Sequence, residues 1–340
     1  MSDVTYYTVS NEPYFFGTVA LLNSLRLTGN AQDLVVLDCG LNAEQRRYLE
    51  RAAMTAKVPE DVAESPILAK PFFAKVATKG VGILIDSDII VTRRLHDIVR
   101  LAQAGSICMY PTSPNDRERW HSEWYDALEL RAPLRRERYM NTGLLAVSTE
   151  RWKDLLERWW EVCVRVPRDQ VFSRAPGPHP FWTGDQDAMN ALLMSEVPRE
   201  ALLELPEYEA VFTGDLHRVK IVDMDTLECS HRGVRTTCLH YTGRNKPWLA
   251  RRWPKARVNA YVKLLPRVLF APDVTVRLQE ELVVPWLRAG ARGRLLRKLL
   301  SVAQVPRRLL RGSAKAIVAR LPNRLRKRLL VFAGRMEHGR

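Results

Sequence analysis

The sequence lacks several features that would assign it to a membrane-spanning or secreted class. No run of consecutive apolar residues approaches the roughly 20 that a membrane-spanning helix needs. The opening MSDVTYYTVSNEPYFF does not combine a basic segment, an apolar segment and a cleavage site, so we expect no secretory signal. The five cysteines include no CxxC pair and are odd in number, which argues against a disulfide framework and against structural zinc. We therefore expect a cytoplasmic protein with reduced, mostly buried thiols.

Acidic residues are nearly missing from one part of the chain. Residues 286–340 hold 16 Lys and Arg side chains against a single acidic residue, Glu337. Because the whole chain carries a net charge of +15, residues 1–285 are neutral and the excess lies in the tail. The main part of the chain is therefore not expected to bind nucleic acid, and any anionic partner belongs to the C-terminus.

The chain does have enough hydrophobic sequence for a large core, with 46% hydrophobic residues among 340. Its first 250 residues alternate stretches typical of strands with stretches typical of helices. The predicted strands are 5–10, 33–39, 81–91, 106–111 and 143–148, and the predicted helices are 11–27, 43–56, 70–79, 150–163 and 184–196. This alternation predicts an α/β fold in which helices cover both faces of a mostly parallel sheet.

Residues 112–140 interrupt the alternation with basic and aromatic residues. The arginines of the segment are Arg117, Arg119, Arg131, Arg135, Arg136 and Arg138, and Trp120, Trp124 and Tyr125 lie among them. A segment of this length between two strands is usually a functional lid or a substrate loop. A helical insertion with a solvated face explains the pattern equally well, so both interpretations stay open. We expect an acceptor to meet this segment.

Two aspartates, Asp86 and Asp88, follow the most apolar predicted strand. Ligands of open α/β sheets bind outside the carboxyl ends of the strands, which is where this pair lies. Carboxylates are suitable ligands for Mn²⁺ or Mg²⁺. An Asp-x-Asp pair also arises by chance, however, and acidic residues often end strands.

A second group of polar residues occurs in CLHYTGRNKPW, residues 238–248. His240 follows a predicted strand at 235–239 and can add a nitrogen ligand to the same cation. Gly243 permits a close backbone approach, and Lys246 can contact a diphosphate. Each residue alone fits an ordinary loop, but their regular spacing favours a binding site.

The sequence resembles the family 8 retaining glycosyltransferases, which include glycogenin and bacterial lipopolysaccharide galactosyltransferases. The similar blocks, in the family's order, are TVSNEPYFFGTVALLNSL, ILIDSDIIV, YMNTGLLAVS with GDQDAMN, and HYTGRNKPW. They span residues 5–248. The resemblance implies a GT-A type Rossmann-like sheet. Because the character of the sequence changes from Leu264, we expect a catalytic domain at 1–264 and a basic helical tail at 265–340.

The resemblance also implies roles for individual residues. The metal ligands for Mn²⁺ or Mg²⁺ would be Asp86, Asp88 and His240, and the contacts to the donor diphosphate would come from Asp86, Gly243 and Lys246. The residues near the uridine would be Thr8, Ser10 and Asn11. The residues around the transferred sugar would be Asn141, Asp185 and Gln186. A further basic contact to the donor would be Lys70 or Lys75.

The resemblance implies a retaining glycosyltransferase that moves a hexose from a UDP-sugar to a glycan or lipid-linked acceptor of the cell envelope. A divalent cation and a lysine would stabilise the charge that develops on the departing diphosphate. Covalent attack by a side chain is left open, although Asp185 is a better nucleophile than Gln186.

Two other functions are considered. A nucleotidyltransferase would be expected to have a glycine-rich phosphate loop after the first strand, and TVSNEPYFF offers none. A catalytically inactive nucleotide- or glycan-binding module on a membrane is opposed by the intact Asp-x-Asp and His-x-x-Gly-x-x-Lys motifs.

The basic tail predicts a membrane partner. Its segments 286–303, 306–321 and 322–336 read as short amphipathic helices with a stripe of leucines. On an anionic membrane each Lys or Arg near the surface contributes about 1 kcal/mol, and the leucines add apolar burial. We expect peripheral association with the inner face of the membrane. A solvated flexible tail and a nucleic-acid contact are the alternatives.

Overall fold

The computed structural model describes residues 4–112, 119–175, 179–206, 208–243, 245–249 and 258–299. Its main sheet has seven strands in the spatial order β3 (Met54–Lys57), β2 (Asp33–Asp38), β1 (Val4–Ser10), β4 (Val81–Ile85), β7 (Met140–Ser148), β6 (Ile107–Pro111) and β8 (Leu202–Glu204). Within this sheet β7 runs antiparallel to both neighbours, and the other adjacent pairs are parallel. The predicted mostly parallel mixed sheet is therefore confirmed.

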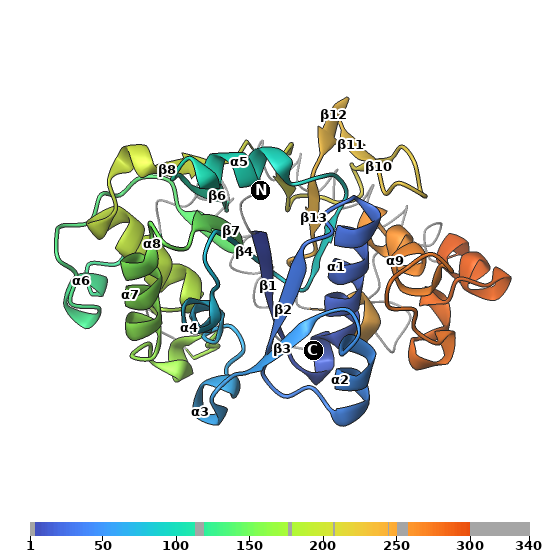
Figure 1. Ribbon diagram of the computed structural model, residues 1–340, viewed down its shortest axis with the longest axis horizontal. Coiled ribbons are helices and arrows are strands. Elements are labelled where there is room, and N and C mark those ends of the chain that lie inside the picture. The colour runs from blue at the N-terminus through green and yellow to red at the C-terminus, as the bar shows by residue number, and fades with distance from the viewer. Residues whose placement is uncertain are drawn as a thin grey trace, which may run out of the picture.

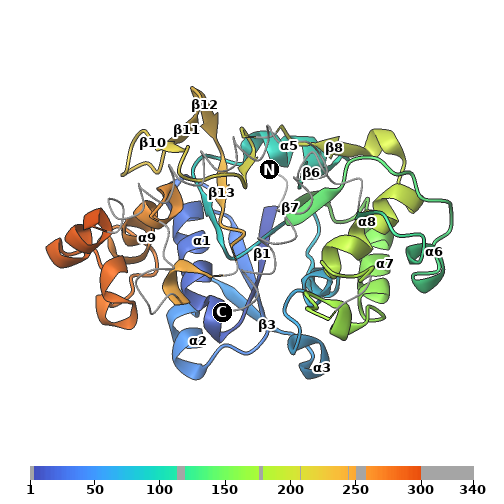
Figure 2. The same cartoon turned by 180° about the vertical axis from the view of Figure 1, so that it is seen from behind.

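Helices cover both faces of the sheet, as Figures 1 and 2 show from opposite directions. The α-helices are α1 (Phe15–Leu27), α2 (Ala43–Leu49), α3 (Glu60–Ala63), α4 (Phe73–Val76), α5 (His96–Gln103), α6 (Trp124–Ala127), α7 (Lys153–Cys163), α8 (Asp185–Glu196) and α9 (Ala260–Phe270). The 3-10 turns are η1 (Glu12–Tyr14), η2 (Lys70–Phe72), η4 (Arg168–Gln170), η5 (Arg199–Ala201), η6 (Pro247–Leu249), η8 (Glu280–Leu282) and η9 (Pro285–Leu287). Helices α7 and α8 lie on one side of the sheet, and α1 and α9 lie on the other.

Two smaller sheets complete the fold. One contains β10 (Lys220–Ile221), β11 (Cys229–His231) and β12 (Val234–Thr236), and the other contains β5 (Ile89–Val91), β13 (Cys238–His240) and β9 (Val211–Phe212). Antiparallel pairing of β5 with β13 brings the end of the predicted strand 81–91 beside residues that lie about 150 positions later. The sheet thus joins the two polar segments that the sequence singled out.

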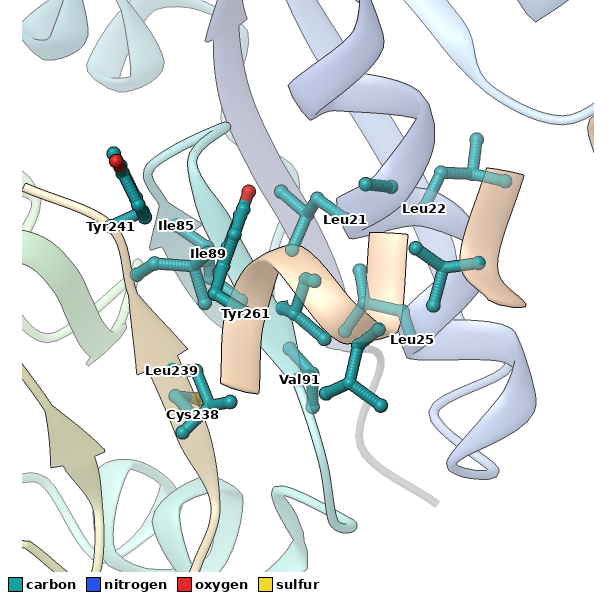
Figure 3. Packing of buried hydrophobic residues seen from close by; sticks show 14 of the residues in the cluster. Leu21, Leu22, Leu25, Ile85, Ile89, Val91, Cys238, Leu239, Tyr241 and Tyr261 are labelled. Carbon is teal, nitrogen blue, oxygen red and sulfur yellow. The ribbon is translucent and has the colours of Figure 1, made fainter. Parts of the chain in front are cut away.

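Each face of the main sheet has its own hydrophobic core, because successive side chains of a strand point to opposite faces. On β1, Tyr6 packs into the core with α1 and α9, whereas Tyr7 packs into the core with α7 and α8. Figure 3 shows the first of these cores, where Leu21 and Leu25 of α1 gather with Val91 of β5 and Tyr261 of α9. All five cysteines are buried and form no disulfide.

Most predicted elements differ from the structure by a few residues at their ends, and the predicted strand 235–239 covers parts of both β12 and β13. Three further differences are larger. The predicted helix 43–56 is wrong beyond Leu49, because residues 54–57 form β3 and pair with β2, and this sheet pairing outweighs local helix propensity. The predicted strand 81–91 is two strands separated by a turn. The predicted helix 70–79 contains only η2 and α4 and ends at Val76.

The described part of segment 112–140 is partly a core element. Trp120 and Trp124 are buried in the core that contains α8, and the indole N–H of Trp124 donates to the Pro180 carbonyl at 2.6 Å. Tyr125 is exposed. The segment is therefore anchored by its tryptophans, while Arg131, Arg136 and Arg138 are exposed outside the short helix α6. Arg117 lies outside the described residues.

The predicted domain boundary between residues 264 and 265 falls inside α9. Side chains from both halves of this helix belong to the core beside α1, and Trp286 and Leu287 are buried in the same core. The packed domain therefore continues past the predicted boundary. Residues 291–299 are helical, while the predicted helices 306–321 and 322–336 lie outside the described residues. Over the described ranges, every helix is too short or too polar to span a membrane.

Candidate active site

Two aspartates and a histidine meet at the carboxyl end of β4. The backbone N–H of Asp86 donates to the Gly143 carbonyl of β7 at 2.9 Å, and pairing of β5 with β13 sets His240 opposite Ile89. The Nε2 atom of His240 lies 3.0 Å from Asp88 Oδ1 and 3.6 Å from Asp86 Oδ2. One ligand atom from each of the three side chains lies within 4.8 Å of the others. Two carboxylates and an imidazole at this spacing can hold a divalent cation.

Two buried lysines contact the carboxylates of this site. Lys70 Nζ lies 2.7 Å from Asp86 Oδ1 and 3.4 Å from Asp185 Oδ2. Lys246 Nζ donates to the carboxylate of Asp88. With three carboxylates facing two ammonium groups, the site has a net negative charge when the histidine is neutral. It therefore attracts a cation although two lysines are already present.

Mutual attraction keeps these buried groups charged. Burial acts to raise the pKa of Asp88, but His240 and Lys246 outweigh it and hold the pKa well below its usual range. Burial acts to lower the pKa of Lys70, but the carboxylates of Asp185 and Asp86 outweigh it and raise the pKa above the ordinary lysine value. Lys70 therefore brings a full positive charge to the site.

Asp185 and Gln186 begin α8 and reach the site through Thr142 of β7. The Thr142 hydroxyl donates to Asp185 Oδ2 at 2.7 Å, and the Thr142 backbone N–H donates to Gln186 Oε1 at 3.3 Å. Asp185 is fully buried, and its Oδ1 atom has no hydrogen-bond partner among the described residues. Burial raises the pKa of Asp185 to about 6, although Lys70 and Thr142 act against this rise.

Asn141 is held by the neighbouring strand β6. A register shift after Met109 sets Tyr110 opposite Asn141, and such bulges often re-aim side chains beside active sites. The Tyr110 hydroxyl donates to Asn141 Oδ1 at 2.6 Å and lies 2.6 Å from His240 Nδ1. The Gly143 backbone N–H donates to the same Asn141 Oδ1 at 2.7 Å. A Cβ at Gly143 would lie 2.6 Å from the His240 ring, so a larger residue at this position would clash with the histidine.

The residues predicted near the uridine lie where β1 ends, next to the end of β4. Thr8 is fully buried, and its hydroxyl has no hydrogen-bond partner among the described residues. Ser10 is also buried and accepts a hydrogen bond from the Thr18 hydroxyl of α1 at 2.6 Å. Asn11 is half-buried, and its side chain accepts from the Tyr14 backbone N–H at 3.2 Å and so caps η1. Asn11 is thus the most open of the three predicted residues.

The block at 240–248 folds back onto the start of α1. The indole N–H of Trp248 donates to the Pro13 carbonyl at 2.7 Å. A Cβ at Gly17 would lie 2.7 Å from the Trp248 ring, so this helix position accepts only glycine without movement. Gly243 is exposed in the same block. The first and the last of the sequence blocks therefore lie against each other.

The structure distinguishes two lysines and adds two residues that the sequence did not indicate. Lys70 lies in the site, while Lys75 on α4 is exposed. Tyr110 and Thr142 were not predicted as site residues. Tyr110 reads as an ordinary strand residue, because its place depends on the register between β6 and β7. Thr142 lies inside the Asn-x-Gly block, so its position directly after the predicted residue Asn141 was the available signal.

Comparison with protein families decides the assignment. The model of the family described as Glycosyl transferase family 8 matches residues 82–252, which is half of the chain. The chain belongs to glycosyl transferase family 8. The matched range contains the glycosyltransferase blocks around Asp86, Asn141, Asp185 and His240. The remaining block, at the start of the chain, lies before it.

Solved structures support the same fold for this family 8 glycosyltransferase. A structure described as the WbbM bifunctional glycosyltransferase in its apo form matches with a TM-score of 0.51 and 13% identity, over 81% of this chain. The chain spans 50% of the length of that protein. A structure described as an active-site mutant of LgtC matches with a TM-score of 0.51 and 12% identity, over 79% of this chain and 98% of that one. No curated protein sequence matches the chain. The predicted GT-A type fold is confirmed.

Proposed function

We propose that this protein is a retaining glycosyltransferase that moves a hexose from a UDP-sugar to a glycan or lipid-linked acceptor and needs Mn²⁺ or Mg²⁺. The observation that carries the proposal is the meeting of Asp86, Asp88 and His240 within 4.8 Å, beside two buried lysines. Membership in glycosyl transferase family 8 supports transfer of a sugar.

The residues of the site suit a divalent cation. Two carboxylates and an imidazole are ligands that Mn²⁺ accepts, and the excess of carboxylates over lysines leaves a charge for the cation to balance. Asp86, Asp88 and His240 would hold it. A cation bound there would act as a Lewis acid that stabilises charge on the departing diphosphate.

The chain's own residues would bind and orient the donor. Lys246 can exchange its partner Asp88 for a phosphate oxygen and thereby keep a paired charge. Lys70 and Thr142 hold Asp185 in place, so its carboxylate would place negative charge beside the transferred sugar. Tyr110 and Gly143 occupy the oxygen of Asn141, so its amide N–H groups are the part that can contact the donor.

The proposed activity is tested by UDP release. The full chain is incubated with a panel of UDP-sugars and Mn²⁺, with and without a chelator, and an Asp88→Asn variant serves as control. We expect chelator-sensitive hydrolysis of one donor that the variant lacks. NMR of the product should show retention of the anomeric configuration, and the opposite anomer would sink that part of the proposal.

If no UDP is released, binding of UDP should be measured next. Metal-dependent UDP binding in a calorimeter without turnover, in the presence of candidate glycan acceptors, would favour the inactive binding module. Absence of both turnover and UDP binding would overturn the proposed donor class.

We also propose that the basic C-terminal tail attaches the protein to the inner face of an anionic membrane. The charge of residues 286–340 supports this role. Trp286 and Leu287 are buried in the core, so the tail is best removed after residue 300. The full chain should float with anionic liposomes and the truncated chain should not. Equal binding of both chains would refute the role of the removed residues.

A further inference from the structure

A short series of hydrogen bonds connects β7 to the ring of His240. The backbone N–H of Gly143 can only donate, so the atom of Asn141 that faces it at 2.7 Å is the oxygen Oδ1. This contact fixes the orientation of the Asn141 amide. Because an amide oxygen carries no hydrogen, the proton in the 2.6 Å contact between Asn141 Oδ1 and the Tyr110 oxygen belongs to the tyrosine.

The single hydroxyl proton of Tyr110 is therefore committed to Asn141. What the tyrosine oxygen presents to His240 is a lone pair, and their 2.6 Å contact then requires a proton on the Nδ1 atom of the histidine. In a neutral imidazole the other nitrogen, Nε2, consequently carries a lone pair and no hydrogen. Nε2 is the ring atom that faces the carboxylates of Asp86 and Asp88.

We propose that Tyr110 and Asn141 are positioning residues that hold His240 in the Nδ1–H tautomer and so present its Nε2 lone pair to the cation. The inference rests on the proposed function in one respect, since that function assigns a cation to Asp86, Asp88 and His240. A histidine that binds a metal commonly donates its other ring N–H to an oxygen, and this partner fixes the ring's tautomer and orientation. Here the partner is the Tyr110 hydroxyl, which donates its own proton to Asn141 and therefore accepts from His240.

Burial strengthens this arrangement. Tyr110 and His240 are both buried, so water cannot readily replace a lost hydroxyl partner. Burial first, and then the charges of Asp86 and Asp88, raise the pKa of the Tyr110 hydroxyl well above its usual value, which keeps it a donor. In the absence of a cation the competing tautomer has an Nε2–H that donates to Asp88 Oδ1 at 3.0 Å. That tautomer needs Tyr110 to donate to Nδ1, which would leave two oxygens 2.6 Å apart with no proton between them.

The first test measures affinity for Mn²⁺ alone, with the free ion followed by electron paramagnetic resonance in the full chain. Tyr110→Phe removes only the hydroxyl and should weaken binding about 10-fold or more. Tyr6→Phe is the matched control, because this buried tyrosine bonds to Asn30 and Gln32 instead. It should bind Mn²⁺ as the unmodified protein does, and thermal unfolding shows whether each variant is folded.

The second test reads the tautomer directly in metal-free protein, from nitrogen NMR of the imidazoles at a pH where the rings are neutral. We expect the His240 proton on Nδ1. Asn141→Ala frees the Tyr110 proton for Nδ1 and should move the ring proton to Nε2, whereas Asn141→Asp keeps an acceptor and should retain Nδ1–H. A proton on Nε2 in the unmodified protein, or unchanged Mn²⁺ affinity in Tyr110→Phe, would overturn the inference. If the unmodified protein binds no Mn²⁺, the proposed metal dependence fails, and the NMR result still decides the tautomer.

Discussion

The two halves of the site are built in different ways. The cation half consists of Asp86, Asp88, His240 and Lys246, and the sugar half, named after the proposed function, consists of Asn141, Thr142, Asp185 and Gln186. Strand pairing between β5 and β13 positions the cation half, and its charges pair directly with each other. Hydrogen bonds through Thr142 position the sugar half, where one buried carboxylate oxygen has no partner among the described residues. The cation half is therefore held by ion pairs whose charged groups can exchange partners, whereas the sugar half is held by fixed hydrogen bonds.

Lys70 joins the two halves. Its ammonium group contacts Asp86 of the cation half and Asp185 of the sugar half. Opposite charges close together lower the free energy of both carboxylates, so Lys70 stabilises one carboxylate in each half. Variants that affect one half and spare the other test whether this division is real.

The largest expected effect concerns the stability of the sugar half. The pKa of Asp185 is raised to about 6 in the folded protein, above its value in the unfolded chain. Its contribution to stability is therefore full below the unfolded pKa and is lost as the pH rises through about 6, by up to about 3 kcal/mol. In Asp185→Asn this loss should be absent. Urea unfolding at about pH 4 and pH 7 measures it, and an unchanged pH dependence would contradict the assignment.

The next effect concerns the cation half. Lys246→Met removes the positive charge from Asp88, so affinity for Mn²⁺ alone should not fall. Affinity for UDP in the presence of Mn²⁺ should fall about 10- to 100-fold, because the proposed charge-assisted contact to the diphosphate would be lost. Calorimetry with Mn²⁺ alone and then with Mn²⁺ plus UDP separates the two quantities. Equal losses of both would mean that Lys246 supports the metal site itself.

The cation half was largely predictable from the sequence. Asp86 and Asp88 lie two positions apart, and His240, Gly243 and Lys246 follow at regular intervals, so each motif is local in the chain. The carboxyl end of a strand is also the expected place for a ligand. What the sequence left open was the choice between Lys70 and Lys75. Which of the two is buried depends on how η2 and α4 pack against the sheet, and the sequence does not show this packing.

The roles of Tyr110 and Thr142 could not be predicted from the sequence. The role of Tyr110 depends on the register shift between β6 and β7, which sets a residue of one strand against Asn141 of the other. The hydrogen bonds of Thr142 depend on where α8 begins relative to β7. Likewise, β3 replaces the end of the predicted helix 43–56 because a sheet edge was available to pair with it. Each outcome is decided by tertiary contacts between distant segments.

A smaller effect tests how the block at 240–248, which contains two residues of the cation half, packs against α1. Gly17→Ala would place a Cβ against the backbone carbonyl of Ser87, between Asp86 and Asp88, and 2.7 Å from the Trp248 ring. Both the aspartate turn and the block that contains Lys246 would have to shift away from α1. We expect the unfolding free energy to fall by about 1–3 kcal/mol, as for other overpacked sites. Gly290→Ala is the matched control, since its Cβ would have its nearest neighbour at 3.8 Å. Equal stability of the two variants would show that the block is not held by this contact.

Thr142→Val should impair the sugar half and leave the cation half intact. It removes the hydroxyl that holds Asp185 but keeps the shape of the side chain, so turnover should fall about 10-fold while Mn²⁺ affinity stays unchanged. Thr149→Val, which removes a buried hydroxyl that donates to the Thr78 carbonyl at 2.7 Å, should lower stability and spare turnover. A fall in Mn²⁺ affinity for Thr142→Val would break the division between the two halves.

The smallest effect is expected from Lys75→Ala. Lys75 is exposed, and no carboxylate among the described residues lies within ion-pair distance of it, so turnover should change by less than about twofold. Lys70→Ala should lower turnover by at least about 10-fold, because it leaves Asp86 and Asp185 without their shared cation. Steady-state rates of both variants at saturating Mn²⁺ give the comparison. Equal losses would mean that α4, and not the single ammonium group of Lys70, connects the cation half to the sugar half.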